Sequence, residues 1–213
     1  MSVEVTSHGQ VTIVEFQPLM PHTTDGELGV TVRELFQDGR KKILIDLGSV
    51  MLPTTLLIGD IVGAHNHACE YGVPIYLCNV GKRIEAMLIT TKLIEVMSIL
   101  KSRAEAVPFL GELDLQLRPG SFEFHSPNVK DFTARLSYLW PSGDTPSSLS
   151  HGAAPSGGRA VVHVVDADGT EIFTRGATDP ESVGVVTGKA GNWRIDLDLV
   201  QYSGKLDLEI HTA

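Results

Sequence analysis

The feature that most constrains the fold is the segment 41–84, in which two short apolar runs flank a longer amphipathic stretch. The runs occupy positions 43–47 and 74–78, and both are too short for a helix. The stretch at 55–71 has helical length, so the order strand–helix–strand predicts a parallel pair of buried strands. In α/β proteins, ligands and partners usually approach where a strand ends and a helix begins. Function is therefore sought at Thr54 and Thr55, two adjacent hydroxyl residues at this junction.

Composition sets outer bounds on function. The chain has 213 residues, of which 42% are hydrophobic and 20% charged, as in ordinary soluble proteins. Its net charge is -9, so the chain lacks the excess of basic residues that a nucleic-acid or anionic-membrane binder needs. No apolar run approaches the roughly 18 residues of a membrane span, and the start lacks a signal-peptide pattern. We therefore expect a cytoplasmic protein in which Cys69 and Cys78 are buried free thiols.

The first 108 residues alternate between strand and helix patterns. Two alternating runs, 3–6 and 11–16, predict a hairpin at the start. Apolar residues at i, i+4, i+7 and i+8 from Leu28 predict a helix that ends near Gly39. Further apolar spacing over 84–100 predicts one or two more helices above the core.

After Pro108 the pattern changes to short alternating runs with the spacing of an all-β sandwich. The runs are 113–117, 122–124, 132–139, 160–165, 193–199 and 206–210. The segment 141–158 is rich in Ser, Pro and Gly, which predicts a flexible loop or linker. The sequence thus predicts an α/β plus all-β chain, with an α/β domain at 1–108 and a β-sandwich domain at 109–213. The alternative places the boundary at the loop itself.

Residues 3 to about 107 resemble a STAS domain, the module shared by sulphate transporters and bacterial anti-sigma factor antagonists. The resemblance is carried by the opening hairpin, VRELFQDGRKKILIDLGSV, the turn and helix, YGVPIYLCNVGKRIEAML and TKLIEVMSILKSRAEAV. Family members end a strand in an Asp-Leu-Ser-Gly-Val-like turn, which DLGSV at 46–50 fits. Placed without gaps, their Asp-Ser-Ser-Gly element falls on Thr54, Thr55, Leu56 and Leu57. The resemblance implies a mixed sheet covered by helices.

The same resemblance implies a non-enzymatic, anti-sigma factor antagonist-like regulator. Thr55 falls on the family's phosphorylatable serine, and Gly59 matches a glycine one turn further on. The implied partner-binding residues are Thr54, Thr55, Leu56, Gly59 and Asp60. The implied partner is an anti-sigma factor of the serine/threonine kinase type, released when Thr55 is phosphorylated.

Physical chemistry offers two roles for these threonines. A phosphate at a helix N-terminus faces unpaired N–H groups and the positive end of the helix dipole, and it changes a docking surface by about two negative charges. A threonine at the same place also commonly caps the helix and does nothing else. The residues alone leave both roles open.

Residues 110–213 bear a second resemblance, to β-sandwich modules of the pre-peptidase C-terminal type. It is carried by SFEFHSPNVKDFTARLSYLWPSGD, VVHVVDADGTEI and AGNWRIDLDLVQYSGKLDLEIHTA. Such modules are associated with binding or targeting rather than catalysis. Trp193 and Tyr202 are expected in the aromatic core of this half.

Other residue groups predict no chemistry. His65 and Cys69 have i, i+4 spacing, but His67 points elsewhere and no second ligand pair follows, so we expect no metal site. Asp166-Ala-Asp168-Gly169 resembles the start of a calcium loop but lacks its closing Glu, and it better fits a hairpin turn. We identify no catalytic motif and expect no cofactor.

Two other functions remain open from the sequence. One is a structural scaffold that forms homo- or hetero-oligomers without a phosphorylation switch. The other is a module that binds a small ligand, such as a nucleotide or lipid, at the same sheet edge.

Overall fold

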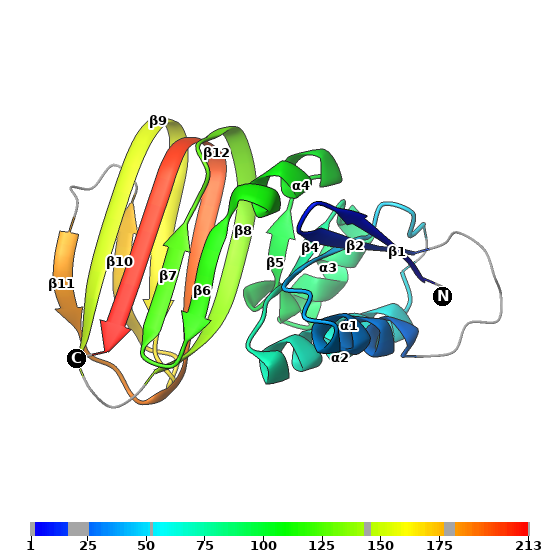
Figure 1. Cartoon of the computed structure of the whole chain (residues 1–213), viewed down its shortest axis with the longest axis horizontal. Coiled ribbons are helices and arrows are strands. Elements are labelled where there is room, and N and C mark those ends of the chain that lie inside the picture. The colour runs from blue at the N-terminus through cyan, green and yellow to red at the C-terminus, as the bar shows by residue number, and fades with distance from the viewer. Residues whose placement is uncertain (1–2, 17–25, 52, 143–145, 177–181, 213) are drawn as a thin grey trace. The chain divides into compact units, whose positions relative to one another are not determined.

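The computed structural model describes residues 3–16, 26–51, 53–142, 146–176 and 182–212 (Figure 1). The chain divides into two compact units, Met1–Gly111 and Glu112–Ala213. In the described residues, the first unit alternates strands with helices, and beyond it every element is a strand. The predicted order of an α/β part followed by an all-β part is therefore observed.

The first unit is built on a five-stranded mixed sheet. Its strands are β1 (Val3–His8), β2 (Val11–Phe16), β3 (Lys42–Asp46), β4 (Ile75–Cys78) and β5 (Ser98–Leu100). They lie in the order β1-β2-β3-β4-β5. The first pair is antiparallel, as the predicted hairpin requires, and the remaining neighbours are parallel. Every residue of β4 is buried, which explains its short apolar run.

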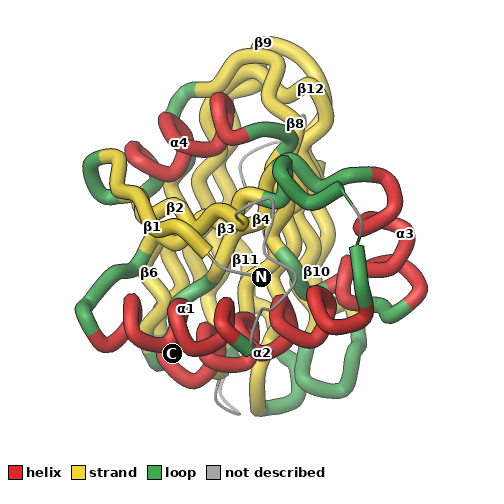
Figure 2. The backbone as a smooth tube through the Cα atoms, turned by 90° about the vertical axis from the view of Figure 1, so that its right-hand side faces the viewer, coloured by secondary structure: helices red, strands yellow, loops and turns green. Residues whose placement is uncertain are grey.

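Helices cover both faces of this sheet. They are α1 (Glu27–Gln37), α2 (Thr55–Tyr71), α3 (Lys82–Thr90), the 3-10 helix η1 (Leu93–Glu95) and α4 (Arg103–Glu112). Figure 2 shows α1 and α2 side by side on one face of the strands and α4 on the other. None of the described helices has the length and apolar character that crossing a membrane requires.

One hydrophobic cluster joins α1, α2 and α3 to the strands beneath them. It includes Val32, Ile45, Ile61, Leu77 and Leu88. Each such fully buried aliphatic side chain stabilises the folded state by roughly 1.5–3 kcal/mol compared with the same side chain left in water. Packing of this face therefore fixes where α2 begins and which of its sides remains in solvent.

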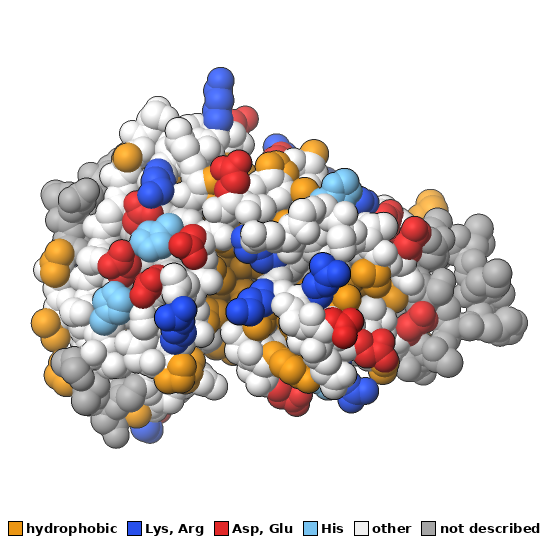
Figure 3. Space-filling view, viewed as in Figure 1, with side chains coloured by type: hydrophobic (Ala, Val, Ile, Leu, Met, Phe, Trp, Pro, Cys, Tyr) orange, Lys and Arg blue, Asp and Glu red, His pale blue; other side chains and the backbone are white. Residues whose placement is uncertain are grey.

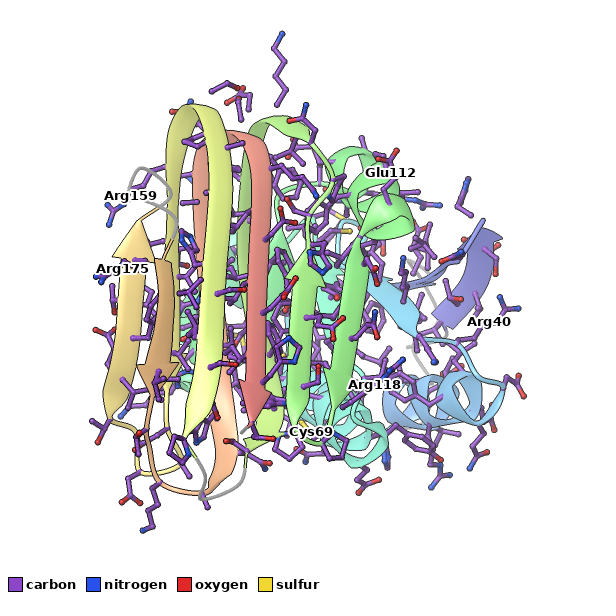
Figure 4. The ribbon with its side chains drawn as sticks, turned by 60° about the vertical axis from the view of Figure 1, so that its left-hand side comes forward. Arg40, Cys69, Glu112, Arg118, Arg159 and Arg175 are labelled. Atoms are coloured by element: carbon purple, nitrogen blue, oxygen red, sulfur yellow. The ribbon has the colours of Figure 1, made fainter. Side chains whose placement is uncertain are left out.

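Three predictions for this unit were wrong. The predicted helix near 93–100 is η1 followed by β5, which pairs in parallel with β4, because a short apolar run fits a buried strand as well as a helix. The change to strands that was predicted directly after Pro108 comes later, because α4 continues through Pro108 to Glu112. Cys69 is exposed on the last turns of α2 (Figure 4), whereas Cys78 is buried as predicted.

Over its described residues, the second unit consists of seven strands in two layers. They are β6 (Asp114–Arg118), β7 (Ser121–His125), β8 (Val129–Ser142), β9 (Ser147–Val165), β10 (Glu171–Gly176), β11 (Ser182–Val186) and β12 (Gly191–Thr212). The first half of β12 lies between β8 and the second half of β9. Its second half lies between β7 and the first half of β9. The two long strands thus belong to both layers.

Aromatic side chains fill the space between the layers. Phe122 and Phe124 on β7 each contact Tyr138 on β8, with ring centroids 5.9 Å apart. Trp140 meets Trp193 edge-to-face at 5.7 Å. Both indoles donate N–H to backbone oxygens at 2.8 Å, so these buried polar groups are satisfied. The predicted burial of Trp193 and of Tyr202 is confirmed.

The predicted flexible loop at 141–158 was wrong for the residues that the structure describes. Strand β9 begins at Ser147, and its first half pairs with β11 on one side and β12 on the other. Because β11 and β12 pair with the backbone N–H and C=O groups of this half of β9, a segment of small residues forms a strand without an apolar pattern of its own. Irregular register near Gly158 and Gly204, both with positive φ, lets the long strands bend from one layer into the other.

The predicted hairpin turn at Asp166–Gly169 is confirmed, since β9 and β10 pair antiparallel on either side of it. Asp166 Oδ1 accepts from the N–H groups of Asp168 and Thr170, and Oδ2 accepts from Lys189 N–H. The Asp166 carboxylate therefore holds the backbone of the turn in place. These donors, that of Lys189 foremost, lower the pKa of Asp166, so their stabilising effect is lost as pH falls through that lowered value.

We expect Gly158→Ala to lower the free energy of unfolding of the second unit by more than about 2 kcal/mol. Gly158 has φ +73°, and an added Cβ would lie 2.0 Å from the carbonyl oxygen of Gln201. Urea unfolding followed by tryptophan fluorescence measures this unit, because both tryptophans lie in it. Gly184→Ala is the control, since nothing lies within 4 Å of its added Cβ. Equal stability of the two variants would contradict the bend at Gly158.

Candidate functional site

Thr54 is the residue that caps α2. Its backbone is extended, with φ -120° and ψ 164°, and its Oγ1 accepts a hydrogen bond from Leu57 N–H at 3.2 Å. The Thr54 carbonyl also accepts from Ile58 N–H at 3.3 Å, which begins the helical ladder. The capping role that the sequence left open for two threonines thus belongs to Thr54.

Thr55 is the first helical residue, and it is exposed. No group in the described part of the chain hydrogen-bonds its hydroxyl. The first turn of α2 carries no acidic side chain, so no carboxylate offsets the positive end of the helix dipole there. The first-turn N–H groups and a free hydroxyl are therefore presented together at the helix start.

Several apolar and small residues close to Thr55 in the chain are exposed. Met51, in the preceding turn, is 85% exposed, and Leu56 is 57% exposed. Gly59, one turn along, is exposed, and nothing lies within 4 Å of where its Cβ would be. We call these residues, Met51, Thr54, Thr55, Leu56 and Gly59, the α2 surface.

Asp60 has a structural contact that the sequence did not reveal. Its Oδ1 accepts from Gly26 N–H at 2.7 Å, and the side chain is half-buried. Gly26 is the N-terminal cap residue of α1 and has φ 89°. Asp60 therefore ties the start of α1 to α2, and this contact sets it apart from its exposed neighbours.

A hydrogen-bonded platform supports the turn before α2. Asp46, at the carboxyl end of β3, accepts through Oδ1 from Gly48 N–H at 2.9 Å and from Asn79 Nδ2 at 2.8 Å. Ser49 Oγ donates to the carbonyl of Phe16 at the end of β2. These hydrogen bonds link the ends of three neighbouring strands and hold the backbone where the chain leaves β3 towards α2. A side chain at Gly48 would crowd this platform, because an added Cβ would lie 3.1 Å from Asp46 Oδ1.

Arg103 completes the platform from the start of α4. Its Nη1 lies 3.0 Å from Glu15 Oε2 and 3.9 Å from Asp46 Oδ2. Sequence reasoning missed this contact because the three residues are far apart in the chain. The arginine thus lies within ion-pair distance of two acidic groups at the sheet edge.

The cysteines near this region do not form a reactive centre. Burial, reinforced by the nearby Asp46 carboxylate, raises the pKa of Cys78 to about 12, so its thiol is protonated at neutral pH. Although Cys69 is exposed as a residue, partial desolvation of its thiol raises its pKa, and burial lowers the pKa of His65, whose Nε2 lies 3.5 Å from Cys69 Sγ. No group of three or more potential ligands within the described ranges could hold a metal ion.

Comparisons with known proteins give structural neighbours only. No protein-family profile and no curated protein matches the sequence. The chain is similar to the solved structure of an anti-sigma-factor antagonist (STAS) domain protein from Planctomyces limnophilus, with 23% identity and a TM-score of 0.43, over 50% of this chain and 95% of that one.

Two carbohydrate-binding modules are also similar in structure. One is TmCBM61 in complex with β-1,4-galactotriose, with 13% identity and a TM-score of 0.28, over 43% of this chain and 67% of that one. The other is the C-terminal CBM6 of LamC from Zobellia galactanivorans, with 14% identity and a TM-score of 0.29, over 46% of this chain and 89% of that one. None of these three is a pre-peptidase C-terminal module.

We expect Thr54→Ala to lower the free energy needed to open the first turn of α2 by about 1 kcal/mol, the usual contribution of a threonine cap. Amide hydrogen exchange in a peptide that begins at residue 54 would then be about fivefold faster, because local opening costs that much less. Thr54→Ser keeps the acceptor and should exchange as the wild type does. Faster exchange in Thr55→Ala than in Thr54→Ala would contradict the assignment of the cap to Thr54.

The two thiols should differ in reactivity with iodoacetamide in the folded protein. Cys69 is exposed, and its reaction should accelerate as pH rises towards its raised pKa. Cys78 should stay unmodified at pH values well below 12 until denaturant exposes it. Peptide mass spectrometry identifies the modified site. Labelling of Cys78 in the folded protein as fast as Cys69 would contradict its burial beside Asp46.

Proposed function

We propose that the first unit is a protein-docking module that engages a partner through the α2 surface, with Thr55 as a contact controlled by phosphorylation. The observation that carries the proposal is the division of roles at the helix start. Thr54 supplies the cap, while Thr55 is exposed and its hydroxyl has no hydrogen-bond partner among the described residues.

The α2 surface has the properties of a docking site. Met51 and Leu56 expose apolar side chains that a partner can bury, and Gly59 leaves space beside them for a partner's side chain. The platform at Asp46 and Arg103 holds the preceding turn, so little order has to be gained on binding. We infer binding rather than catalysis as the activity of this surface.

A phosphate on Thr55 would be well placed to switch the docking. It would accept charge-assisted hydrogen bonds from the N–H groups of the first turn, where no acidic side chain competes. It would also place about two negative charges beside exposed Leu56, and a partner that buries this leucine would have to desolvate them. Phosphorylation is therefore expected to release the partner.

The sequence resemblance of the first half to STAS domains supplies the partner class. We propose an anti-sigma factor of the serine/threonine kinase type, which would both bind the α2 surface and phosphorylate Thr55. The two free cysteines fit a reducing compartment such as the cytoplasm. For the second unit we propose a role in binding or targeting.

Incubation with such a kinase and ATP should add about 80 Da, the mass of one phosphate, to the wild-type chain. The gain should disappear in Thr55→Ala and persist in Thr90→Ala, a change of another exposed threonine on a helix of the same unit. Intact-mass spectrometry measures the gain. Persistence of the gain in Thr55→Ala would refute the assignment.

A chain that binds the kinase but gains no mass would be a docking scaffold without a switch. Binding that survives Leu56→Asp would move the docking site away from the α2 surface altogether. Surface plasmon resonance with the immobilised kinase distinguishes these outcomes, and Asn66→Asp, at another exposed position of α2, is the matched control.

A further inference from the structure

Strand β11 forms an edge of the second unit. It pairs antiparallel with β9, with Val183 opposite Ser150 and Val185 opposite Ser148. Within the described ranges, β9 is the strand with which it pairs. Alternate N–H and C=O groups of β11 therefore point away from the sheet, and Figure 1 shows the strand at the margin of the unit.

The side chains of β11 make this edge apolar. Val183 is 85% exposed and Val185 is 73% exposed, and both lie on the same face because strand side chains alternate. Gly184 between them has nothing within 4 Å of an added Cβ. Figure 3 shows hydrophobic side chains along the margin where β11 lies.

Two other outer strands of the unit, β6 and β10, carry features that block pairing between edges, whereas β11 does not. Strand β6 has Asp114 and Arg118 at its ends, and β10 has Glu171, Arg175 and an irregular register. Figure 4 labels Arg118 and Arg175 on these strands. The sequence of β11 is SVGVV, which contains neither a charge nor a proline.

We infer that β11 is a self-association edge, which pairs antiparallel with β11 of a second copy around a twofold axis at Gly184. The segment Val183-Gly184-Val185 reads the same in both directions. Antiparallel pairing in this register therefore sets Val183 of each copy opposite Val185 of the other, with all four valines on one face. Glycine meets glycine at the axis, where no side chain separates the backbones.

Charge and size limit this contact to a weak, reversible one at the uncharged edge. Each chain carries a net charge of -9, so two copies repel over most of their surfaces, and an uncharged strand is where they can approach. An edge of five residues buries far less than the roughly 1,200–2,000 Å² of a stable interface. Association should therefore depend on concentration, and it should strengthen in high salt, which screens the repulsion.

Sedimentation velocity of the full chain, in reducing buffer from about 10 μM to about 1 mM, tests the inference. The weight-average mass should rise from 23.0 kDa towards twice that value. Val185→Lys places a charge on the edge and should remain monomeric throughout. Val200→Lys changes charge equally at a valine that is 51% exposed on β12, a strand with neighbours on both sides, and should associate as the wild type does.

Matching tryptophan fluorescence shows that both variants are folded. A wild-type chain that stays at 23.0 kDa, or a Val185→Lys chain that associates normally, would overturn the inference. Thr55→Glu should leave association unchanged, because the edge is independent of the α2 surface. The two proposals can therefore fail separately.

Discussion

The hydrogen bond from Leu57 N–H to Thr54 Oγ1 is the interaction on which the functional account depends. It satisfies one of the amides that every helix start leaves unpaired, and it uses Thr54 to do so. The neighbouring Thr55 takes no part in this cap and stands exposed at the positive end of α2. Two adjacent residues of the same type thereby acquire different roles, one structural and one available for recognition.

This local geometry rests on the sheet edge beneath it. Asp46 holds Gly48 and Asn79, and Arg103 neutralises the acidic groups from the other face. The packed face of α2, which includes Ile61, fixes the rotation of the helix, so Leu56 and Gly59 point to solvent. Burial beside Asp46 also keeps the Cys78 thiol protonated at neutral pH.

Sequence reasoning recovered what local patterns determine. It placed α2, the strands around it and the hairpin turn at Asp166, because apolar spacing and turn residues encode these directly. It failed where distant partners decide: β9 is a strand because β11 and β12 pair with it, although its own residues resemble a linker. Likewise, the contact of Asp60 with Gly26 links positions 34 residues apart, and no local sequence pattern predicts it.

The most direct test is affinity capture from the native cell extract with three chains: wild type, Thr55→Val and Thr55→Glu, each quantified by mass spectrometry. Thr55→Val keeps the side-chain shape, whereas Thr55→Glu adds a negative charge at the start of α2. The account predicts that wild type and Thr55→Val retain a common partner that Thr55→Glu loses. Identical partners in all three captures would show that charge at this position regulates nothing.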